Sequence, residues 1–253
     1  MPQNFQPQGT APSSTYSSPT WAPAAKDAVG TALGTSRLWF TIAQGIVSEV
    51  YYPRPDIPQL KDMGFIITDN MGFWVELRRM NDYYVTWQDE AIPAITITHN
   101  HDRFTFTLKI CSDPERDVLL LDFVLTGDVS LQLYVLAAPR IGEDATCNQA
   151  WADEWEGRPL LWAEQGPFGL ALAVVDRSGS PALLQRSVGI VGASDGWQNF
   201  QINGCMTWHY AQAGPGEVAL TAQLPSSGTL ALGISTSREA AGTLALQSLA
   251  AGF

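Results

Sequence analysis

The sequence predicts a large all-β protein, an antiparallel sandwich or barrel with one short C-terminal helix. Short runs rich in β-branched and aromatic residues recur at intervals of about 8–12 residues, the spacing typical of sandwiches and barrels. Gly, Pro, Asn or Asp separates these runs. Only two stretches, residues 194–200 and 237–250, have a helical composition. A chain of 253 residues is long enough to bury a generous core.

The chain begins with a different composition. Residues 1–25 are rich in Pro, Ser, Gln, Thr and Ala and lack apolar periodicity, which is typical of a flexible tail. Trp21 is the large apolar residue expected to lay this tail over the surface of the protein. We therefore place the folded domain at residues 26–253.

The expected strands follow in order after Lys26. In the first half they are residues 37–42, 46–52, 63–68, 73–77, 83–87, 94–98, 104–110, 118–125 and 131–136. In the second half they are residues 160–164, 168–175, 187–191, 207–211, 217–224 and 228–235. Residues 104–110 alternate apolar and polar side chains, as a half-buried strand should.

The two helical stretches have recognisable ends. Residues 194–200 are expected to form a single turn that Ser194 or Asp195 caps. The second stretch has Arg238 and Glu239 near its start, an Ala/Leu body and Gly252 as its stop. It is the predicted C-terminal helix.

The turn Tyr51-Tyr52-Pro53-Arg54-Pro55-Asp56 joins two expected strands. Two prolines flank an arginine, and they fix the backbone and remove amide donors. Arg54 and Asp56 should therefore lie on a stiff projection that a sheet anchors. Rigid loops on a sheet are common places for groups that contact another molecule.

The formal net charge of −11 limits the partners. It argues against nucleic acid and against an anionic membrane surface, since both attract positive charge. Neutral partners such as sugars are compatible with it. No apolar run approaches the roughly 20 residues that cross a bilayer. No signal peptide is visible, which fits a cytoplasmic protein or the mature form of a secreted or periplasmic one.

The cysteines and the sequence motifs limit the kinds of reaction that this chain could catalyse. Cys111, Cys147 and Cys205 are expected to be buried free thiols, with one disulfide pair as the alternative. The sequence contains no P-loop, GxGxxG or HExxH pattern. These absences weigh against a self-contained kinase or dehydrogenase. Gly192-Ala193-Ser194-Asp195-Gly196 has GxSxG spacing, but it falls in the stretch expected to cap a short helix.

Histidines offer one candidate metal pattern. His99 and His101 would share one face of a strand beside Asp102, so both rings could meet one metal ion. A polar hairpin turn explains the same residues and is the favoured interpretation, and no metal is assigned. His209 lies between Trp208 and Tyr210 and is expected to be a hydrogen-bonded residue of a strand.

Acidic residues gather at Glu143-Asp144 and again at Asp153-Glu154-Trp155-Glu156. Glycosidases need two carboxyl groups about 5–5.5 Å or about 6.5–9.5 Å apart. The sequence does not show such a distance, and a solvated acidic loop is the favoured interpretation.

Three tryptophans surround this acidic stretch: Trp151, Trp155 and Trp162. Indole faces pack well on the C–H faces of pyranose rings, so a sugar-stacking platform is one interpretation. Core or interface packing is the commoner use of tryptophan.

The segment KDAVGTALGTSRLWFTIAQGIVSEVYYPRPDIPQLKDMGFIITD, which begins at Lys26, resembles the N-terminal domain of bacterial glucoamylases and glucodextranases, glycoside hydrolase family fifteen. DPERDVLLLDFVLTGD, LQLYVLAAPRIG with the following NQAW, RSVGIVGASDGWQNF and LALGISTSREAAGTLALQSLAAGF resemble later parts of the same domain. The resemblance implies a β-supersandwich similar in shape to galactose mutarotases. It also implies that a helical linker and an (α/α)-barrel holding both catalytic glutamates follow this domain.

The resemblance therefore implies a non-catalytic domain whose partner is its own catalytic barrel, with no catalytic residue and no cofactor in this chain. Tyr51, Tyr52, Arg54 and Asp56 are expected either at the domain interface bordering the substrate entrance or in a purely structural brace. The acidic clusters lack the ligand spacing of an EF-hand, so the sequence does not assign a calcium site, and calcium binding by the parent enzyme stays an open question. The linkage preference, α-1,4 or α-1,6, and the choice between hydrolysis and transfer also stay open.

Two alternatives remain. One is an independent carbohydrate-binding module for α-glucans that uses Trp151, Trp155 and Trp162. The other is a mutarotase-like epimerase that uses His99, His101 or His209 with a nearby carboxylate.

Overall fold

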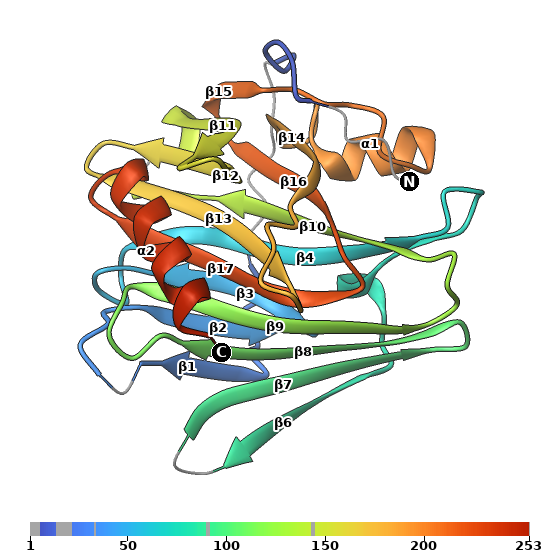
Figure 1. Cartoon of the computed structure of the whole chain (residues 1–253), viewed down its shortest axis with the longest axis horizontal. Helices are drawn as coiled ribbons and strands as arrows, with labels where there is room; N and C mark the ends of the chain where they lie inside the picture. Colours follow the sequence, from blue (N-terminus) through green and yellow to red (C-terminus); the bar gives the residue numbers. More distant parts are fainter. Residues whose placement is uncertain (1–5, 14–21, 33, 90–91, 143–144, 253) are drawn as a thin grey trace.

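The computed structural model describes residues 6–13, 22–32, 34–89, 92–142 and 145–252. Two antiparallel sheets of eight and nine strands lie face to face in this part of the chain (Figure 1). Their strands make up most of the described secondary structure, and the helices are short. The prediction of an all-β antiparallel sandwich is confirmed.

Each sheet mixes early and late parts of the chain. The order of the eight-stranded sheet is β1 (Ala28–Thr31), β2 (Trp39–Ala43), β3 (Ile46–Tyr51), β4 (Pro58–Thr68), β10 (Gln132–Pro139), β16 (Val218–Leu224) and β14 (Leu184–Ile190), with β5 (Trp74–Glu76) paired to β4. The order of the nine-stranded sheet is β15 (Gln212–Gly216), β11 (Asn148–Trp155), β12 (Arg158–Gln165), β13 (Phe168–Asp176), β17 (Ser227–Ser235), β9 (Val118–Gly127), β8 (Phe104–Ser112), β7 (Ile92–His101) and β6 (Tyr83–Asp89).

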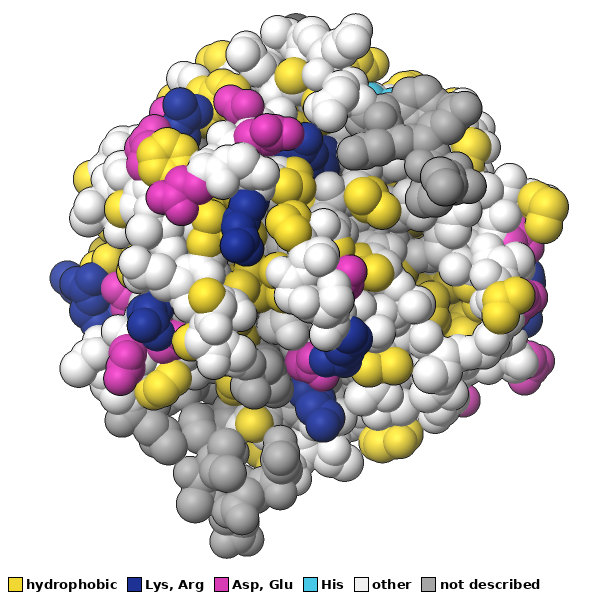
Figure 2. Space-filling view, viewed as in Figure 1, with side chains coloured by type: hydrophobic (Ala, Val, Ile, Leu, Met, Phe, Trp, Pro, Cys, Tyr) yellow, Lys and Arg dark blue, Asp and Glu magenta, His cyan; other side chains and the backbone are white. Residues whose placement is uncertain are grey.

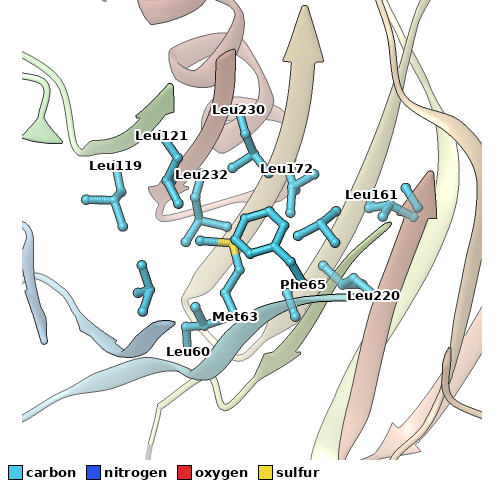
Figure 3. Close-up of a cluster of buried hydrophobic side chains, with 14 of the residues drawn as sticks. Leu60, Met63, Phe65, Leu119, Leu121, Leu161, Leu172, Leu220, Leu230 and Leu232 are labelled. Carbon is cyan, nitrogen blue, oxygen red and sulfur yellow. The ribbon is translucent and has the colours of Figure 1, made fainter. Parts of the chain in front are cut away.

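The main core lies between the two sheets. Met63 and Phe65 of β4 point toward leucines of the opposite sheet, among them Leu121, Leu172 and Leu232 (Figure 3). All five side chains are at most 1% exposed. Each large apolar side chain buried in this way contributes about 1.5–3 kcal/mol. The alternation predicted for residues 104–110 is present, because β8 buries every second residue.

Short helices cover the outer faces of the sheets. Helix α2 (Arg238–Ala251) packs on β13 and β17 through a second apolar cluster that includes Trp162, Ala241 and Ala245. Helix α1 (Gly196–Asn203) places Phe200 against Tyr134 on the eight-stranded sheet. Two 3₁₀ turns, η1 (Leu77–Arg79) and η2 (Ala145–Cys147), complete the described helices. None of the described helices is long and apolar enough to cross a membrane.

The close approach of α2 to the sheet depends on a glycine. A Cβ atom added at Gly242 would lie 2.5 Å from Cη2 of Trp162. Ser237 caps the start of the helix, and its side chain accepts a hydrogen bond from the amide of Ala240. Its end at Ala251, one residue before Gly252, agrees with the predicted C-terminal helix.

The predictions for residues 207–211 are wrong. The expected strand at residues 207–211 is absent, and β15 begins only at Gln212. Oδ1 of Asn199 accepts hydrogen bonds from the amides of Thr207 and Trp208, both at 2.8 Å, which holds this stretch beside α1. His209 therefore lies in a loop between α1 and β15 and is not a strand residue.

The acidic stretch 153–156 is not a loop. Asp153 and Glu154 belong to strand β11, which ends at Trp155, and Glu156 and Gly157 form a two-residue turn to β12 with φ values of 52° and 71°. Positive φ at both positions matches the twist that hairpins favour. Glu143 and Asp144 lie outside the described residues. Helix α1 is also longer than the single turn expected, with Asp195 as its cap.

Two further predictions concern the cysteines and the N-terminal tail. None of the three cysteines forms a disulfide bond, but Cys147 is exposed and the other two are only partly buried, so the expected burial is wrong. In the tail, residues 6–13 run beside β15, where the amide of Gln8 donates to the carbonyl of His209 at 2.8 Å. Trp21 lies outside the described residues.

Candidate functional site

The β3–β4 loop is closed by its own backbone. The amide of Tyr52 donates to the carbonyl of Ile57 at 3.0 Å, and the amide of Ile57 donates to the carbonyl of Arg54 at 3.1 Å. Nε2 of Gln59, a fully buried side chain, donates to the carbonyl of Tyr52 at 2.8 Å. These bonds fix both ends of the loop on the eight-stranded sheet.

Tyr52 is the anchor of this loop. Its side chain is 2% exposed and its ring lies edge-on to Phe168 of the other sheet. Its hydroxyl accepts a hydrogen bond of 2.6 Å from Nη2 of Arg37, whose guanidinium also lies over the ring. Burial, reinforced by the carboxylate of Asp117, raises the pKa of Tyr52. Tyr52 thus faces the protein interior, whereas the sequence placed it with the contact residues.

Arg37 and Asp117 belong to the same site, although the sequence did not single them out. The amide of Arg37 donates to Oδ1 of Asp117 at 2.6 Å, and its Nη2 donates to Oδ2 at 3.0 Å. The two residues are 80 positions apart, and they link the segment before β2 to the segment before β9. Local spacing contains no signal for such a pair.

Arg54 and Asp56 project from the anchored loop. Nε of Arg54 donates to Oδ1 of Asp56 at 3.0 Å, and its Nη2 donates to Oδ2 at 2.7 Å. The two side chains are nevertheless 68% and 61% exposed. An exposed pair adds at most about 1 kcal/mol to stability. Its planar, paired geometry fixes the orientation of the guanidinium.

Tyr51 is the last residue of β3 and is partly buried. Burial raises its pKa to about 12, and a nearby carboxylate, Glu49, adds to the effect through charge and a hydrogen bond. Its hydroxyl is therefore neutral at ordinary pH and able to donate a hydrogen bond. Tyr51 is a polar group at the edge of the loop, unlike the interior Tyr52.

The three tryptophans lie elsewhere, beneath helix α2. Nε1 of Trp155 donates to Oγ1 of Thr243 at 3.3 Å, and its ring lies edge-on to Trp162. Trp162 is only 3% exposed, so its indole has no open face for a sugar. Trp151 is partly buried and carries the guanidinium of Arg238 over its ring at 4.6 Å. The three tryptophans pack in the cluster beneath helix α2, and Trp151 lies at the edge of that cluster.

The histidines have separate environments. His99 is 1% exposed, and its Nε2 lies 2.8 Å from the carbonyl oxygen of Gly45. Burial lowers the pKa of His99. His101 is exposed at the end of β7, and its Nδ1 accepts from the amide of Arg103 in the turn to β8. Burial also lowers the pKa of His209, which lies in the loop before β15. Among the described residues, no three His, Cys, Asp or Glu side chains are grouped as a metal site would require.

Comparisons with known proteins agree with this architecture. Residues 11–253 match the family model described as glucodextranase, domain N. A glucoamylase of Clostridium sp. (strain G0005) is 29% identical over 201 residues, which are 77% of this chain and 28% of that protein. The crystal structure of a bacterial glucoamylase complexed with acarbose superposes with a TM-score of 0.88 at 25% identity, covering 98% of this chain and 37% of that one.

The chain thus spans about a third of the length of these proteins or less. The match to the family model covers nearly the whole described domain, and the solved structure has the same fold. The chain belongs to the glucodextranase domain N family and is the N-terminal β-sandwich domain of a glucoamylase-type protein.

Proposed function

We propose that this domain is a non-catalytic support for a catalytic barrel in the same polypeptide, and that the β3–β4 loop contacts this barrel beside its substrate entrance. The relatives are glucoamylases about three times as long as this chain, which leaves room in them for further domains. The parent protein would act on an α-glucan. The observation that carries the proposal is the exposed Arg54–Asp56 pair on a loop that the sheet holds rigid.

Rigidity is what makes this loop suited to docking. Association costs less free energy when the contacting side chains are already ordered in the free protein. Tyr52 is fixed by Phe168 and Arg37, and Asp56 fixes the guanidinium of Arg54. Arginine is also enriched among the residues that dominate binding energy at interfaces. The loop therefore presents a preordered cation at small entropic cost.

Replacing Arg54 by Ala in the polypeptide that contains both domains tests the proposal. Arg54 is 68% exposed, so the free energy of unfolding of this domain alone should change by less than about 1 kcal/mol. The two-domain protein should show a lower melting temperature, a lower kcat/KM on an α-glucan, or both. Unchanged kinetics together with unchanged stability would reject the contact role.

Arg177→Ala is the matched control. Arg177 also forms a surface ion pair, with Asp122, and its side chain is 49% exposed. It lies in the turn after β13 and not in the β3–β4 loop. This substitution should leave kcat/KM of the two-domain protein unchanged, so a loss in both variants would indicate a general charge effect.

A further inference from the structure

A polar cleft of about 370 Å³ lies beside the exposed end of β11. It is lined by Gln6, Trp151, Asp153, Glu154, Arg186 and Gln212, among others. Strand β15 is short, and its pairing with β11 stops at Trp151 and Gln212. The last residues of β11 therefore extend past their neighbour and border the cleft. Figure 2 shows acidic and basic side chains gathered over the β11–β12 hairpin.

We propose that this cleft binds a neutral saccharide, with Arg186 and Glu154 as hydrogen-bonding groups and Trp151 as the apolar contact. Its volume is at the small end of the range of about 300–1,000 Å³ for ligand sites. A ligand of one or two sugar rings fits that size. The site differs from the predicted three-tryptophan platform, because only Trp151 of that set lines the cleft.

Arg186 is the unusual group in the lining. It belongs to β14, is 4% exposed, and its Nη1 donates to the carbonyl of Asp153 at 2.5 Å. Within the described part of the chain, this is the one acceptor that its guanidinium is seen to bond. A guanidinium has five N–H donors, and a buried cation is costly unless they are used. A ligand rich in hydroxyl oxygens supplies acceptors for the others.

The lining of the cleft also contains hydrogen-bond acceptors, the carboxylates of Asp153 and Glu154. Asp153 and Glu154 are exposed, and their carboxylates raise the pKa of Arg186 against the larger, lowering effect of its burial. The carboxylates accept hydrogen bonds and the guanidinium donates them. A sugar hydroxyl does both, so adjacent hydroxyls fit a lining that alternates donors and acceptors.

The charge of the lining indicates a neutral ligand. One arginine and two carboxylates give a net charge of −1, which disfavours a phosphate or a carboxylate ligand. The described residues hold no group of three or more potential metal ligands here or elsewhere. A neutral polyhydroxylated molecule satisfies both constraints.

Trp151 supplies the apolar part of the lining. Arg238 covers one face of its ring at 4.6 Å, and the residue pairs in register with Trp162 of the adjacent strand. The ring is therefore held in place before any ligand arrives. The ring surface that stays exposed can pack against the C–H face of a pyranose, the combination of apolar wall and few polar groups typical of ligand sites.

Saturation-transfer NMR and calorimetric titration of the whole chain with maltose and isomaltose test the proposal. Both methods should detect binding of at least one of these disaccharides. Glucose 6-phosphate should bind more weakly than glucose, because the net charge of the lining repels it. Absence of binding by either disaccharide would overturn the proposal, as would a preference for the phosphate.

Matched variants locate the site. Trp151→Ala and Glu154→Gln should each weaken disaccharide binding about tenfold or more, whereas Trp87→Ala, at a 58% exposed tryptophan on β6, should leave it unchanged. Gln212→Ala replaces an exposed side chain and serves if Trp151→Ala fails to fold. Equal affinities in all these variants would place the sugar elsewhere. The test uses this chain alone, so its outcome is independent of docking to a catalytic barrel.

Discussion

The hydroxyl of Ser248 in helix α2 donates a 2.6 Å hydrogen bond to Oδ2 of Asp113, in the segment between β8 and β9. Both residues are buried. The same carboxylate accepts hydrogen bonds from the amides of Glu115 and Arg116. One acidic side chain therefore joins the C-terminal helix to the end of the sandwich that carries the candidate site.

Ser248→Ala should lower the free energy of unfolding by about 1.5–3 kcal/mol, the range for a hydrogen bond to a charged group. Chemical denaturation of the chain measures this. Burial tends to raise the pKa of Asp113, but the hydrogen bonds from Ser248 and the two amides lower it overall. The stabilisation is therefore present above the unfolded-state pKa of about 3.9 and is lost as the pH falls below it. A variant with wild-type stability at pH 7 would contradict this role.

Gly242→Ala should destabilise the protein even though alanine favours helix by about 1 kcal/mol over glycine. The added Cβ would lie 2.5 Å from the buried ring of Trp162, which cannot move without displacing α2. Overpacking of this kind typically costs about 1–3 kcal/mol. Gly252→Ala is not an adequate control because its φ is positive, so Ala250→Ser, at an exposed position of α2, serves instead. A more stable Gly242→Ala variant would show that α2 does not pack as described.

Asp62 should make stability fall as the pH rises. Burial raises its pKa to about 6, despite the opposing effect of its ion-pair partner Arg78. The folded state therefore binds a proton more tightly than the unfolded state, whose pKa is about 3.9. The contribution of Asp62 is fully present below pH 4 and is lost as the pH rises through 6, by at most about 3 kcal/mol. Unfolding measured from pH 4 to 7 should show this slope in the wild type and a flatter one in Asp62→Asn.

Tyr52→Phe should lower the free energy of unfolding by about 0.5–1.5 kcal/mol, because it removes the hydroxyl that accepts from Arg37. The ring contact with Phe168 should survive. A double-mutant cycle with Arg37→Ala isolates the pair. If the two substitutions are additive, the Arg37–Tyr52 bond is not what anchors the loop.

Alternation and turn chemistry were sufficient to predict most of the strands. Strand β8 is a clear case, because its every second residue is buried between the sheets. Strand β11 escaped prediction because Gln149, Asp153 and Glu154 are exposed polar residues, a composition that also fits a loop. The absence of a strand at residues 207–211 depends on the side chain of Asn199, which no local pattern at 207–211 can reveal.

One part of the candidate site could likewise be predicted from the sequence, and another part could not. The pairing of Arg54 with Asp56 is local, and the two flanking prolines made it predictable. The interior position of Tyr52 depends on Arg37, Asp117 and Phe168, which come from three distant segments. Two adjacent tyrosines look alike in the sequence, and only the sheet decides that Tyr52 faces inward while Tyr51 stays at the edge.

Hydrogen–deuterium exchange, compared between this domain alone and the two-domain polypeptide, tests docking through the β3–β4 loop most directly. The amides of Arg54 and Asp56 lie in the exposed part of this loop. They should exchange at least about tenfold more slowly when the catalytic barrel is present, while the exposed turn at Glu156 and Gly157 should be unaffected. Equal exchange of Arg54 and Asp56 in both proteins would contradict docking through this loop.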